Sequence, residues 1–349
     1  MSLRPYTAVL IIPTGIGAAI GGYAGDALPV ARAMAQMVDC LITHPNVLNG
    51  AQLYWPLPNA FYVEGYALDR FAAGEWGLAP THQNRVGLVL DRAIESELQL
   101  RQIQAAEATR ATLGLRLTDY VITDAPLGVE LRTAPSGATW GTIQNPGSLL
   151  RAVDRLITQA GAEAIAVVAR FPDDQDSAAL QEYRHGQGVD PLAGAEAVIS
   201  HLVVRTFRVP SAHAPALLPL PLDPQLSPRS AAEEIGFTFL PCVLAGLSRA
   251  PQFVTSPKAT AIWSHQVDAV IVPATACGGS AILSLSQGQA QVIAVKDNQT
   301  KMQVTPEALG IPALQVNSYL EALGAIAAHR AGVSVAALSP HLSSLRPVC

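Results

Sequence analysis

Short apolar runs alternate with helical patterns along most of this chain, and this alternation limits the folds open to it. Most of the runs are continuously apolar, which is typical of strands buried on both faces of a parallel sheet. The pattern predicts an α/β protein with mostly parallel, open, Rossmann-like sheets and helices on both faces. The predicted strands are Ala8–Ile12, Cys40–Thr43, Val86–Leu90, Tyr120–Thr123, Ala164–Ala169, Ala269–Val272, Val292–Val295 and Ala313–Val316.

The segments between these strands carry helix signals. Ile94–Leu113 has apolar residues along one side and is followed by Gly114, which suits a C-terminal cap. We expect Asp26 to cap a helix that runs to about Val38. Ser318–Arg330 is predicted to form the last strong helix.

A proline-dense stretch, Pro210–Pro228, interrupts the alternation. Its composition predicts an extended segment that either crosses between two lobes or straps one of them. We expect an N-terminal α/β lobe over residues 1–190 and a C-terminal α/β lobe over residues 191–349, with a single domain as the alternative.

The composition excludes some classes of protein. The chain is 50% hydrophobic and 14% charged, but it holds no window of about 18 uninterrupted apolar residues, so no membrane span is predicted. Its net charge of −5 and its scarcity of lysine argue against a nucleic-acid partner. Apolar, charge-poor composition favours a homo-oligomer with a buried interface. Four widely separated cysteines without a CxxC pair favour free thiols in the cytoplasm.

A strand runs directly into a glycine-rich loop between Leu10 and Asp26. Glycine lets backbone amides turn toward a ligand, and a strand, such a loop and a helix N-terminus together form a corner suited to anions. The alternative is a turn that packs closely against a neighbouring strand. The residues expected to contact a ligand here are Thr14, Gly15, Gly17, Gly21, Gly22 and Asp26.

The spacing of Gly15, Gly17 and Gly21 is close to a dinucleotide fingerprint. However, the second predicted strand ends in Thr43 and His44 instead of the acid that would bind a ribose hydroxyl. We therefore expect a phosphate or carboxylate here, with nicotinamide binding as an alternative; no cofactor can be named.

A second glycine loop follows the predicted strand Ala269–Val272. Cys277 would lie at the start of a helix, whose dipole lowers a thiol pKa, so Cys277 is the best candidate for a nucleophile. The alternative is a small buried residue at a tight turn. The amides of Gly278, Gly279 and Ser280 are predicted to form an anion hole.

Polar residues follow other strands at the edge where ligands gather in such folds. His44 is a candidate acid or base, with Asn46 and Asn49 nearby as ligand-binding residues; the alternative is a histidine that caps a turn. Asp297 and Asn298 suit ribose, sugar or amide recognition, although both residue types also favour turns.

An aromatic-rich stretch and two further histidines complete the candidates. Glu64, between Tyr62 and Tyr66, is expected to form a lid or wall of the site. Glu196 and His201 are five residues apart and so do not share a helical face well. No pair of histidines has the spacing of metal ligands, so no metal site is predicted.

Five blocks of the chain together carry a family resemblance: Pro13–Gly17, Gly21–Asp26, Thr43–Asn49, Tyr62–Tyr66 and Ala276–Gly279. They resemble a family found in cyanobacteria and plant plastids, the domain of unknown function 3326, and the resemblance covers nearly the whole chain. It implies a photosynthetic source and a soluble cytoplasmic or stromal location, and it supplies neither an activity nor catalytic residues.

The leading hypothesis is an enzyme that binds a small anionic metabolite on the two glycine loops and performs thiol-dependent hydrolysis or transfer. The first alternative is an NAD(P)-dependent oxidoreductase. The second is a metabolite sensor or assembly factor without enzyme activity, which would have a pocket without converging titratable groups. All three depend on the two glycine loops lying side by side and facing one hollow.

Overall fold

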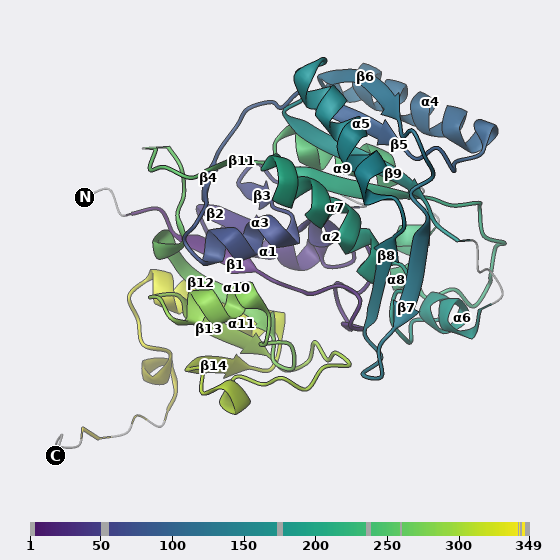
Figure 1. Ribbon diagram of the computed structural model, residues 1–349. Coiled ribbons are helices and arrows are strands. Elements are labelled where there is room, and N and C mark those ends of the chain that lie inside the picture. The colour runs from purple at the N-terminus through teal and green to yellow at the C-terminus, as the bar shows by residue number, and fades with distance from the viewer. Residues whose placement is uncertain are drawn as a thin grey trace.

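A computed structural model describes residues 4–49, 56–172, 177–234, 239–258, 260–340, 342, 344 and 345 (Figure 1). Two parallel sheets dominate the fold, which confirms the predicted α/β class. All eight predicted strands are present, with ends shifted by a few residues at most. Continuously apolar sequence corresponds to full burial here; for example, every residue of Val86–Leu90 is buried.

The larger sheet has the strand order β14-β13-β12-β1-β2-β3, and each pair is parallel. Its strands come from both ends of the chain, because β1 pairs with both β2 and β12. The strands are β1 (Thr7–Leu10), β2 (Cys40–Thr43), β3 (Ala60–Tyr62), β12 (Val267–Pro273), β13 (Gln291–Val295) and β14 (Ala313–Val316).

The smaller parallel sheet has the order β10-β9-β5-β6. Two antiparallel strand pairs, β7–β8 and β4–β11, accompany the sheets. The strands are β4 (Gly77–Ala79), β5 (Val86–Leu90), β6 (Leu117–Ile122), β7 (Val129–Thr133), β8 (Thr139–Ile143), β9 (Ala164–Arg170), β10 (Ser211–Ala216) and β11 (Gln252–Val254).

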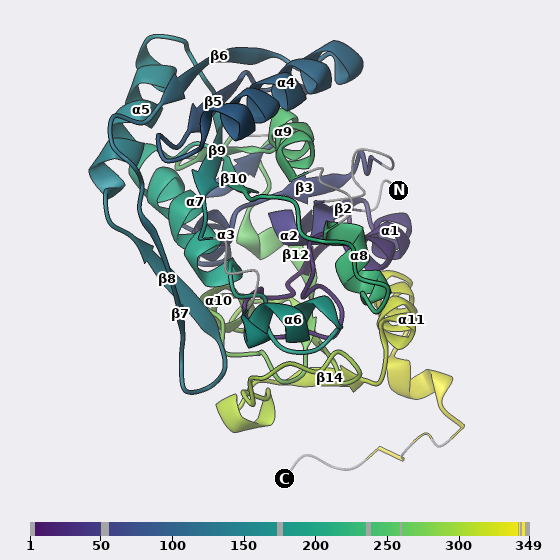
Figure 2. The same ribbon diagram turned by 90° about the vertical axis from the view of Figure 1, so that its right-hand side faces the viewer.

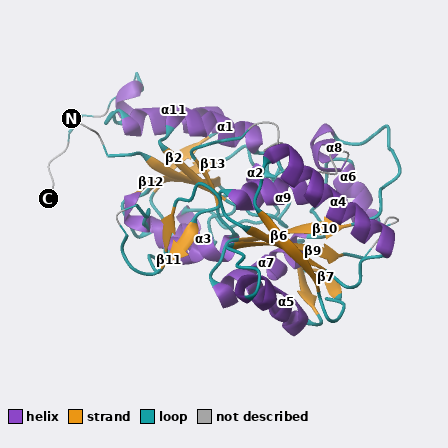
Figure 3. Ribbon diagram, turned by 90° about the horizontal axis from the view of Figure 1, so that it is seen from above, coloured by secondary structure: helices purple, strands orange, loops and turns teal. Residues whose placement is uncertain are grey.

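Helices cover both faces of each sheet (Figures 2 and 3). On the larger sheet, α1 and α11 lie on one face and α3 and α10 on the other; on the smaller sheet, α4 and α9 lie opposite α5 and α7. The longer helices are α1 (Leu28–Met37), α3 (Gly65–Ala72), α4 (Ser96–Leu113), α5 (Pro146–Thr158), α7 (Ala193–Phe207), α9 (Phe239–Ser248) and α11 (Tyr319–Arg330). The shorter ones are α2 (Pro45–Leu48), α6 (Ala178–Arg184), α8 (Pro228–Glu234) and α10 (Ser280–Ser286), with 3-10 turns at Ser264–Gln266, Glu307–Leu309 and Val335–Leu338.

The two sheets do not divide at residue 190. The chain leaves the larger sheet after β3, builds the smaller sheet from β5 to β10, and returns to the larger sheet at β12. One cluster of buried side chains also continues from β1 and α1 through α9 to β5 and α4. The expected boundary fails because β9 and β10, which lie on either side of it, pair with each other.

The helix-capping and proline expectations had mixed outcomes. Gly114 ends α4 in the left-handed conformation, as predicted. Asp26 does not cap α1, since the N-cap is Ala27 and no side chain caps that end. The start of Pro210–Pro228 forms β10, and Pro215 is tolerated there because β10 is an edge strand.

Helix α7 occupies a central position in this arrangement. It contacts β10, α5, α3 and the β7–β8 hairpin. Two glycines allow the hairpin to approach it closely: a Cβ added to Gly194 would overlap the backbone of Thr139 and Trp140, and one added to Gly141 would overlap Ala195. The position of α7 therefore depends on glycine at both contacts.

We predict that Gly194→Ala lowers the free energy of unfolding by about 1–3 kcal/mol, because the added methyl group must push the hairpin away from α7. Urea unfolding measures this change. Gly324→Ala is the control, because a Cβ there meets no atom within 4 Å, and alanine in mid-helix should stabilise the protein by about 0.5–1 kcal/mol. Equal effects of the two substitutions would contradict the packing argument.

Candidate functional site

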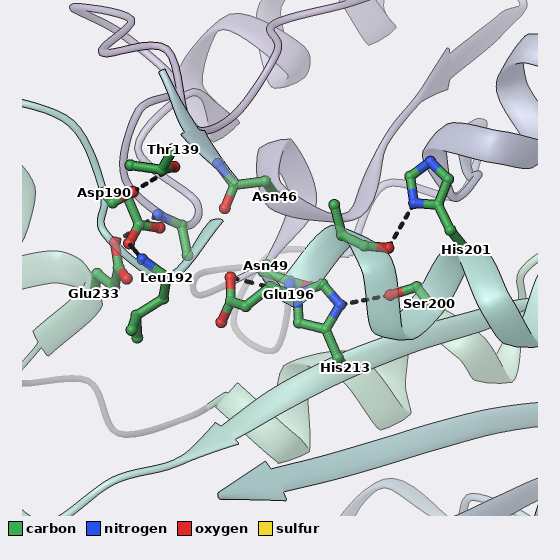
Figure 4. Close-up of polar contacts among 12 residues, drawn as sticks. Asn46, Asn49, Thr139, Asp190, Leu192, Glu196, Ser200, His201, His213 and Glu233 are labelled. Atoms are coloured by element: carbon green, nitrogen blue, oxygen red, sulfur yellow. Dashed lines mark hydrogen bonds and ion pairs between the residues drawn. The ribbon is translucent and has the colours of Figure 1, made fainter. Parts of the chain in front are cut away.

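A cavity of about 460 Å³ lies between the two sheets. Its wall is made by the segments that follow β1 and β2, the N-terminal ends of α3 and α10, one face of α7, and β10. Figure 4 shows part of it. The polar residues that line it are Thr14, His44, Asn46, Asn49, Glu64, Asp69, Asp190, Glu196, Ser200, His201, His213, Glu233 and Ser280.

The two glycine loops lie side by side, because they follow the paired strands β1 and β12. Each loop reaches the cavity only in part: the first through Ile11, Pro13, Thr14 and Ala24, and the second through Gly279 and Ser280. The structure therefore brings the loops together but places most of their glycines elsewhere.

The glycines of the first loop are packed against protein. A Cβ on Gly15 would lie 2.8 Å from Thr139 Oγ1, and one on Gly17 would lie 3.0 Å from the carbonyl of Gly188. Gly21 packs on the side chain of Ile12, and Gly22 on the carbonyl of Ala18. The close-packing alternative describes this loop better than the anion corner does. It also argues against a pyrophosphate in the fingerprint Gly15-x-Gly17-x-x-x-Gly21.

Three amides that could have bound an anion are already hydrogen-bonded to side chains. Ile20 N–H donates to Asn298 Oδ1 (2.9 Å), Gly21 N–H to Asp26 Oδ1 (2.7 Å) and Ala24 N–H to Glu233 Oε2 (2.9 Å). Oxygen atoms of the protein itself thus occupy the positions expected for a ligand's oxygens.

None of the predicted ligand-binding residues Asp26, Asp297 and Asn298 lines the cavity. Asp26 and Asn298 accept hydrogen bonds from the first glycine loop. The carboxylate of Asp26 pairs with Arg229 at 3.0 Å. Asn298 is buried and also donates to the carbonyl of Ile20 and to Tyr319 Oη. Asp297 is exposed. Their expected role in binding a ligand does not fit these positions.

Cys277 is fully buried and does not line the cavity. Burial raises the pKa of its thiol to about 11, with a smaller contribution from Glu307, so the expected lowering by a helix dipole is wrong. Its backbone N–H donates to the carbonyl of Val304 (2.9 Å), and Gly278 packs against the Val304 side chain. This part of the second loop is a tight turn with a small buried residue.

His44 lines the cavity, but its chemistry differs from the prediction. The backbone N–H of Ile12 donates to His44 Nε2 (3.0 Å), which places the ring proton on Nδ1. Burial lowers the pKa of His44 to about 4, so the ring is neutral at pH 7 and does not titrate near neutrality. A neutral ring with one bonded nitrogen can donate from Nδ1 but is a weak base.

Other predicted residues do reach the cavity. Asn46 Nδ2 donates to the carbonyl of Gly21 (2.9 Å), and Asn49 Oδ1 accepts from Tyr62 Oη (2.9 Å). Glu64 caps α3, because its Oε2 accepts from the amides of Tyr66 and Ala67. Tyr62 and Tyr66 do not line the cavity themselves.

One face of α7 supplies residues that the sequence analysis placed apart. Ala193, Glu196, Ala197, Ser200 and His201 all line the cavity, at the i, i+3, i+4, i+7, i+8 spacing of a helix face. Glu196 and His201 therefore lie on one broad helical face, contrary to the expectation from their spacing. The sequence does carry a signal for this part of the site, a stripe of polar residues along an otherwise apolar helix.

A relay of one hydrogen bond and one imidazole–carboxylate contact connects this face to β10. His213 Nδ1 lies 2.5 Å from Ser200 Oγ, and His213 Nε2 lies 3.4 Å from Glu196 Oε2 (Figure 4). His213 faces the cavity because side chains alternate along a strand, and its neighbours Ala212 and Ala214 point into the core. The order Ser–His–Glu is that of a catalytic triad with the two ring nitrogens exchanged.

A second imidazole–carboxylate pair joins α7 to α3. His201 Nδ1 lies 2.5 Å from the carbonyl of Ala197 and 3.0 Å from Glu64 Oε1. Glu64 is almost completely buried, and burial raises its pKa, with His201 and the two capping amides opposing the rise. The Ala197 carbonyl can only accept, so Nδ1 carries the proton and Nε2 is left as the acceptor.

Two further acids, Asp190 and Glu233, lie on one side of the cavity in Figure 4. Glu233 Oε2 accepts from Tyr183 Oη (2.7 Å), and Asp190 Oδ1 accepts from the amide of Leu192 (2.8 Å). Burial raises the pKa of Glu233 to about 7. Burial also raises the pKa of Asp190 well above its usual range, and the charges of Glu196 and Glu233 add to this effect.

Among the residues that the structure describes, five carboxyl groups line the cavity and no lysine or arginine does. Two arginines of the neighbouring segments are paired with carboxylates outside the lining: Arg229 with Asp26 and Arg184 with Glu234. This composition argues against the expected anionic ligand, which would meet carboxyl groups without a compensating cation.

In the part of the chain that the structure describes, no three or more His, Cys, Asp or Glu side chains form a group that could hold a metal ion. Among the same residues, no single helix is long and apolar enough to cross a membrane, and one bent pair, Pro228–Glu234 with Phe239–Ser248, passes by length and composition alone.

The fold and the cavity define an α/β protein with a carboxyl- and imidazole-lined site between two parallel sheets. Residues 7–339 match the family described as "Protein of unknown function (DUF3326)", and the chain belongs to this family, as the resemblance implied. It is similar to an uncharacterized lipoprotein of Synechococcus sp. (strain ATCC 27144 / PCC 6301), with 64% identity over 339 residues, 97% of this chain and 94% of the relative. No solved structure matches.

We predict that Cys277 resists thiol reagents in the folded protein, because its sulfur is buried and its pKa is raised to about 11. Native protein treated with an aromatic disulfide at pH 8 should leave Cys277 unmodified in peptide mass maps, and urea-unfolded protein should show it modified. Rapid native labelling of Cys277 would restore the nucleophile hypothesis.

We predict that Glu233→Gln stabilises the protein at pH 8 but not below pH 4.5. The folded-state pKa of Glu233 is about 7 against an ordinary value of 4.5, so the folded state keeps the proton longer and loses stability as pH rises through this window. Removing the charge should restore on the order of 2 kcal/mol at pH 8. Urea unfolding at both pH values measures it, with exposed Glu97→Gln as the control.

Proposed function

We propose that the cavity is the active site of a hydrolase or transferase in which Ser200 is the nucleophile and His213 the general base. The observation that supports this most directly is the relay Ser200–His213–Glu196 in the wall of the cavity. The thiol-dependent reaction is replaced by a hydroxyl-dependent one, because Cys277 lies outside the cavity.

The geometry suggests how each group would act. With the ring proton on Nε2 facing Glu196, His213 Nδ1 accepts the proton of Ser200 as Oγ attacks an electrophilic carbon. Glu196 stabilises the imidazolium that forms, and the imidazolium then returns its proton to the leaving group. A water molecule, deprotonated by the same nitrogen, then attacks the ester formed on Ser200 and releases the acid, and the imidazolium returns the proton to Ser200 Oγ. If another nucleophile attacks in place of water, the reaction is a transfer.

Converging titratable groups also favour an enzyme over a sensor. A binding protein needs shape and hydrogen bonds, whereas this cavity holds two imidazole–carboxylate pairs and a hydroxyl group within hydrogen-bond reach of one of them. His201 and Glu64 would supply a second site of proton exchange at the α3 side.

The cytoplasmic location and the homo-oligomer expected from the sequence stay predictions. The Synechococcus relative is named a lipoprotein, and that name belongs to the relative. Of the cysteines, Cys40, Cys242 and Cys277 are buried, and Cys349 lies outside the described residues, as does Trp55.

We predict that a fluorophosphonate reagent phosphonylates Ser200 with loss of fluoride, because Ser200 Oγ is bonded to a base. Intact-protein and peptide mass spectrometry detect the adduct. His213→Asn should slow labelling at least about 100-fold, in line with the loss of a general base, and Ser200→Ala should abolish it. Ser280→Ala, which removes another hydroxyl lining the cavity, is the control and should keep the adduct. Unmodified Ser200 at millimolar reagent would reject the nucleophile role.

A further inference from the structure

We infer that the substrate of this site carries a positive charge, an amine or a guanidinium group, which is held between Asp190 and Glu233 beside the Ser200–His213 relay. This inference rests on the proposed function for the location of the reacting bond, but its charge argument stands on the cavity alone. It reverses the anionic ligand expected from the sequence.

The charge of the whole lining favours a cation. Five carboxyl groups line the one cavity of about 460 Å³, and among the described residues three histidines but no lysine or arginine accompany them; the carboxyl groups belong to Glu64, Asp69, Asp190, Glu196 and Glu233. Cavities of this size take small organic ligands. An anion in this cavity would meet carboxyl oxygens without a compensating cation, which costs free energy.

Two arginines close to these acids are paired with carboxylates that do not line the cavity. Arg229 reaches Asp26 at 3.0 Å, and Arg184 pairs with Glu234 at 2.9 Å. Glu233, next to Glu234 in sequence and part of the cavity lining, accepts hydrogen bonds from uncharged donors, Tyr183 Oη and the amide of Ala24. Within the described residues, the acids outside the lining thus have basic partners, whereas the hydrogen bonds of Glu233 come from neutral groups.

The spacing of the groups favours an organic cation over a metal ion. The carboxyl groups of Asp190, Glu196 and Glu233 all line the cavity, yet no three of the described acids and histidines converge as metal ligands. A metal ion needs oxygen atoms within about 2.0–2.6 Å of one point. An ammonium or guanidinium group presents several N–H donors in different directions and suits dispersed acceptors better.

The position of Asp190 and Glu233 relative to the Ser200–His213 relay indicates how a bound substrate would be oriented. In Figure 4, Asp190 and Glu233 lie to one side, Ser200 and His201 to the other, and Glu196 with His213 between them. Asp190 is fixed by the amide of Leu192 at the start of α7, and Ser200 lies on the same helix. A cation bound at Asp190 would therefore place the rest of the molecule along α7 toward Ser200.

The test uses three probes with the same four-carbon chain: 1,4-diaminobutane, 1,4-butanediol and succinate. Isothermal titration calorimetry at pH 7, in two buffers of different ionisation enthalpy, measures the affinity and the protons exchanged. We expect the diamine alone to bind and to release protons, because a cation favours the ionised form of acids that are partly protonated at this pH. An anion in the same site would take protons up.

Two variants separate recognition from folding. Glu233→Gln should weaken diamine binding at least tenfold while leaving the apo protein folded, and exposed Glu97→Gln should leave the affinity unchanged. Among the described residues, the titratable groups that act on Glu233 are Tyr23, Tyr183, Asp190, Glu196 and Asp26, none of which is basic; Asp26 is itself paired with Arg229.

The outcomes distinguish this inference from the proposed function. Binding of succinate or butanediol in place of the diamine overturns the charge inference, even if Ser200 is phosphonylated. Tight binding of Mg²⁺, Ca²⁺ or Zn²⁺ that competes with the diamine overturns it in favour of a metal site. Diamine binding without modification of Ser200 supports the charge inference and rejects the nucleophile.

Discussion

The candidate site depends on one helix being held between two sheets. Helix α7 packs against β10 and α5 of the smaller sheet and against α3 of the larger one, and its polar face closes the cavity from that position. The contact with the β7–β8 hairpin requires Gly141 and Gly194, because any side chain there would overlap the backbone opposite. The distances among Ser200, His213 and Glu196 are therefore set by backbone packing.

The glycine loops illustrate two uses of the same residue. In sequence, a loop such as Gly15–Gly22 predicts amides free to bind an anion. In the structure, Asp26 and Asn298 accept hydrogen bonds from that loop, and a side chain at Gly15 or Gly17 would collide with neighbouring chain. The loop needs glycine because several segments meet there, and its packing and hydrogen bonds hold the chain in place beside the cavity.

Local patterns predicted most of the sheet architecture. Continuous apolar runs identified strands such as Cys40–Thr43 and Val86–Leu90, because burial on both faces leaves no polar positions. The same reasoning brought the two glycine loops to one edge, since β1 and β12 are neighbours. Two strands of the parallel sheets were missed for different reasons. Strand β3 has only three residues, and β10 lies in proline-rich sequence that resembles a linker.

The site itself was only partly within reach of the sequence. Thr14, His44 and Glu64 were found because they follow strands or start helices, where ligands gather. His213 was not identified from the sequence, because its role depends on its contact with Ser200. That contact forms only when β10 pairs with β9 and α7 packs against β10.

Buried acids in the cavity also show why stability and function pull in different directions here. Burial and neighbouring carboxylates raise the pKa of both Asp190 and Glu233, so the protein without a ligand is most stable when these groups keep their protons. A fold selected for stability alone would pair them with an arginine, as it does for Asp26 and Glu234. The described residues provide no basic partner for either group, which costs free energy without a ligand and is explained if a bound cation completes the site, as we propose.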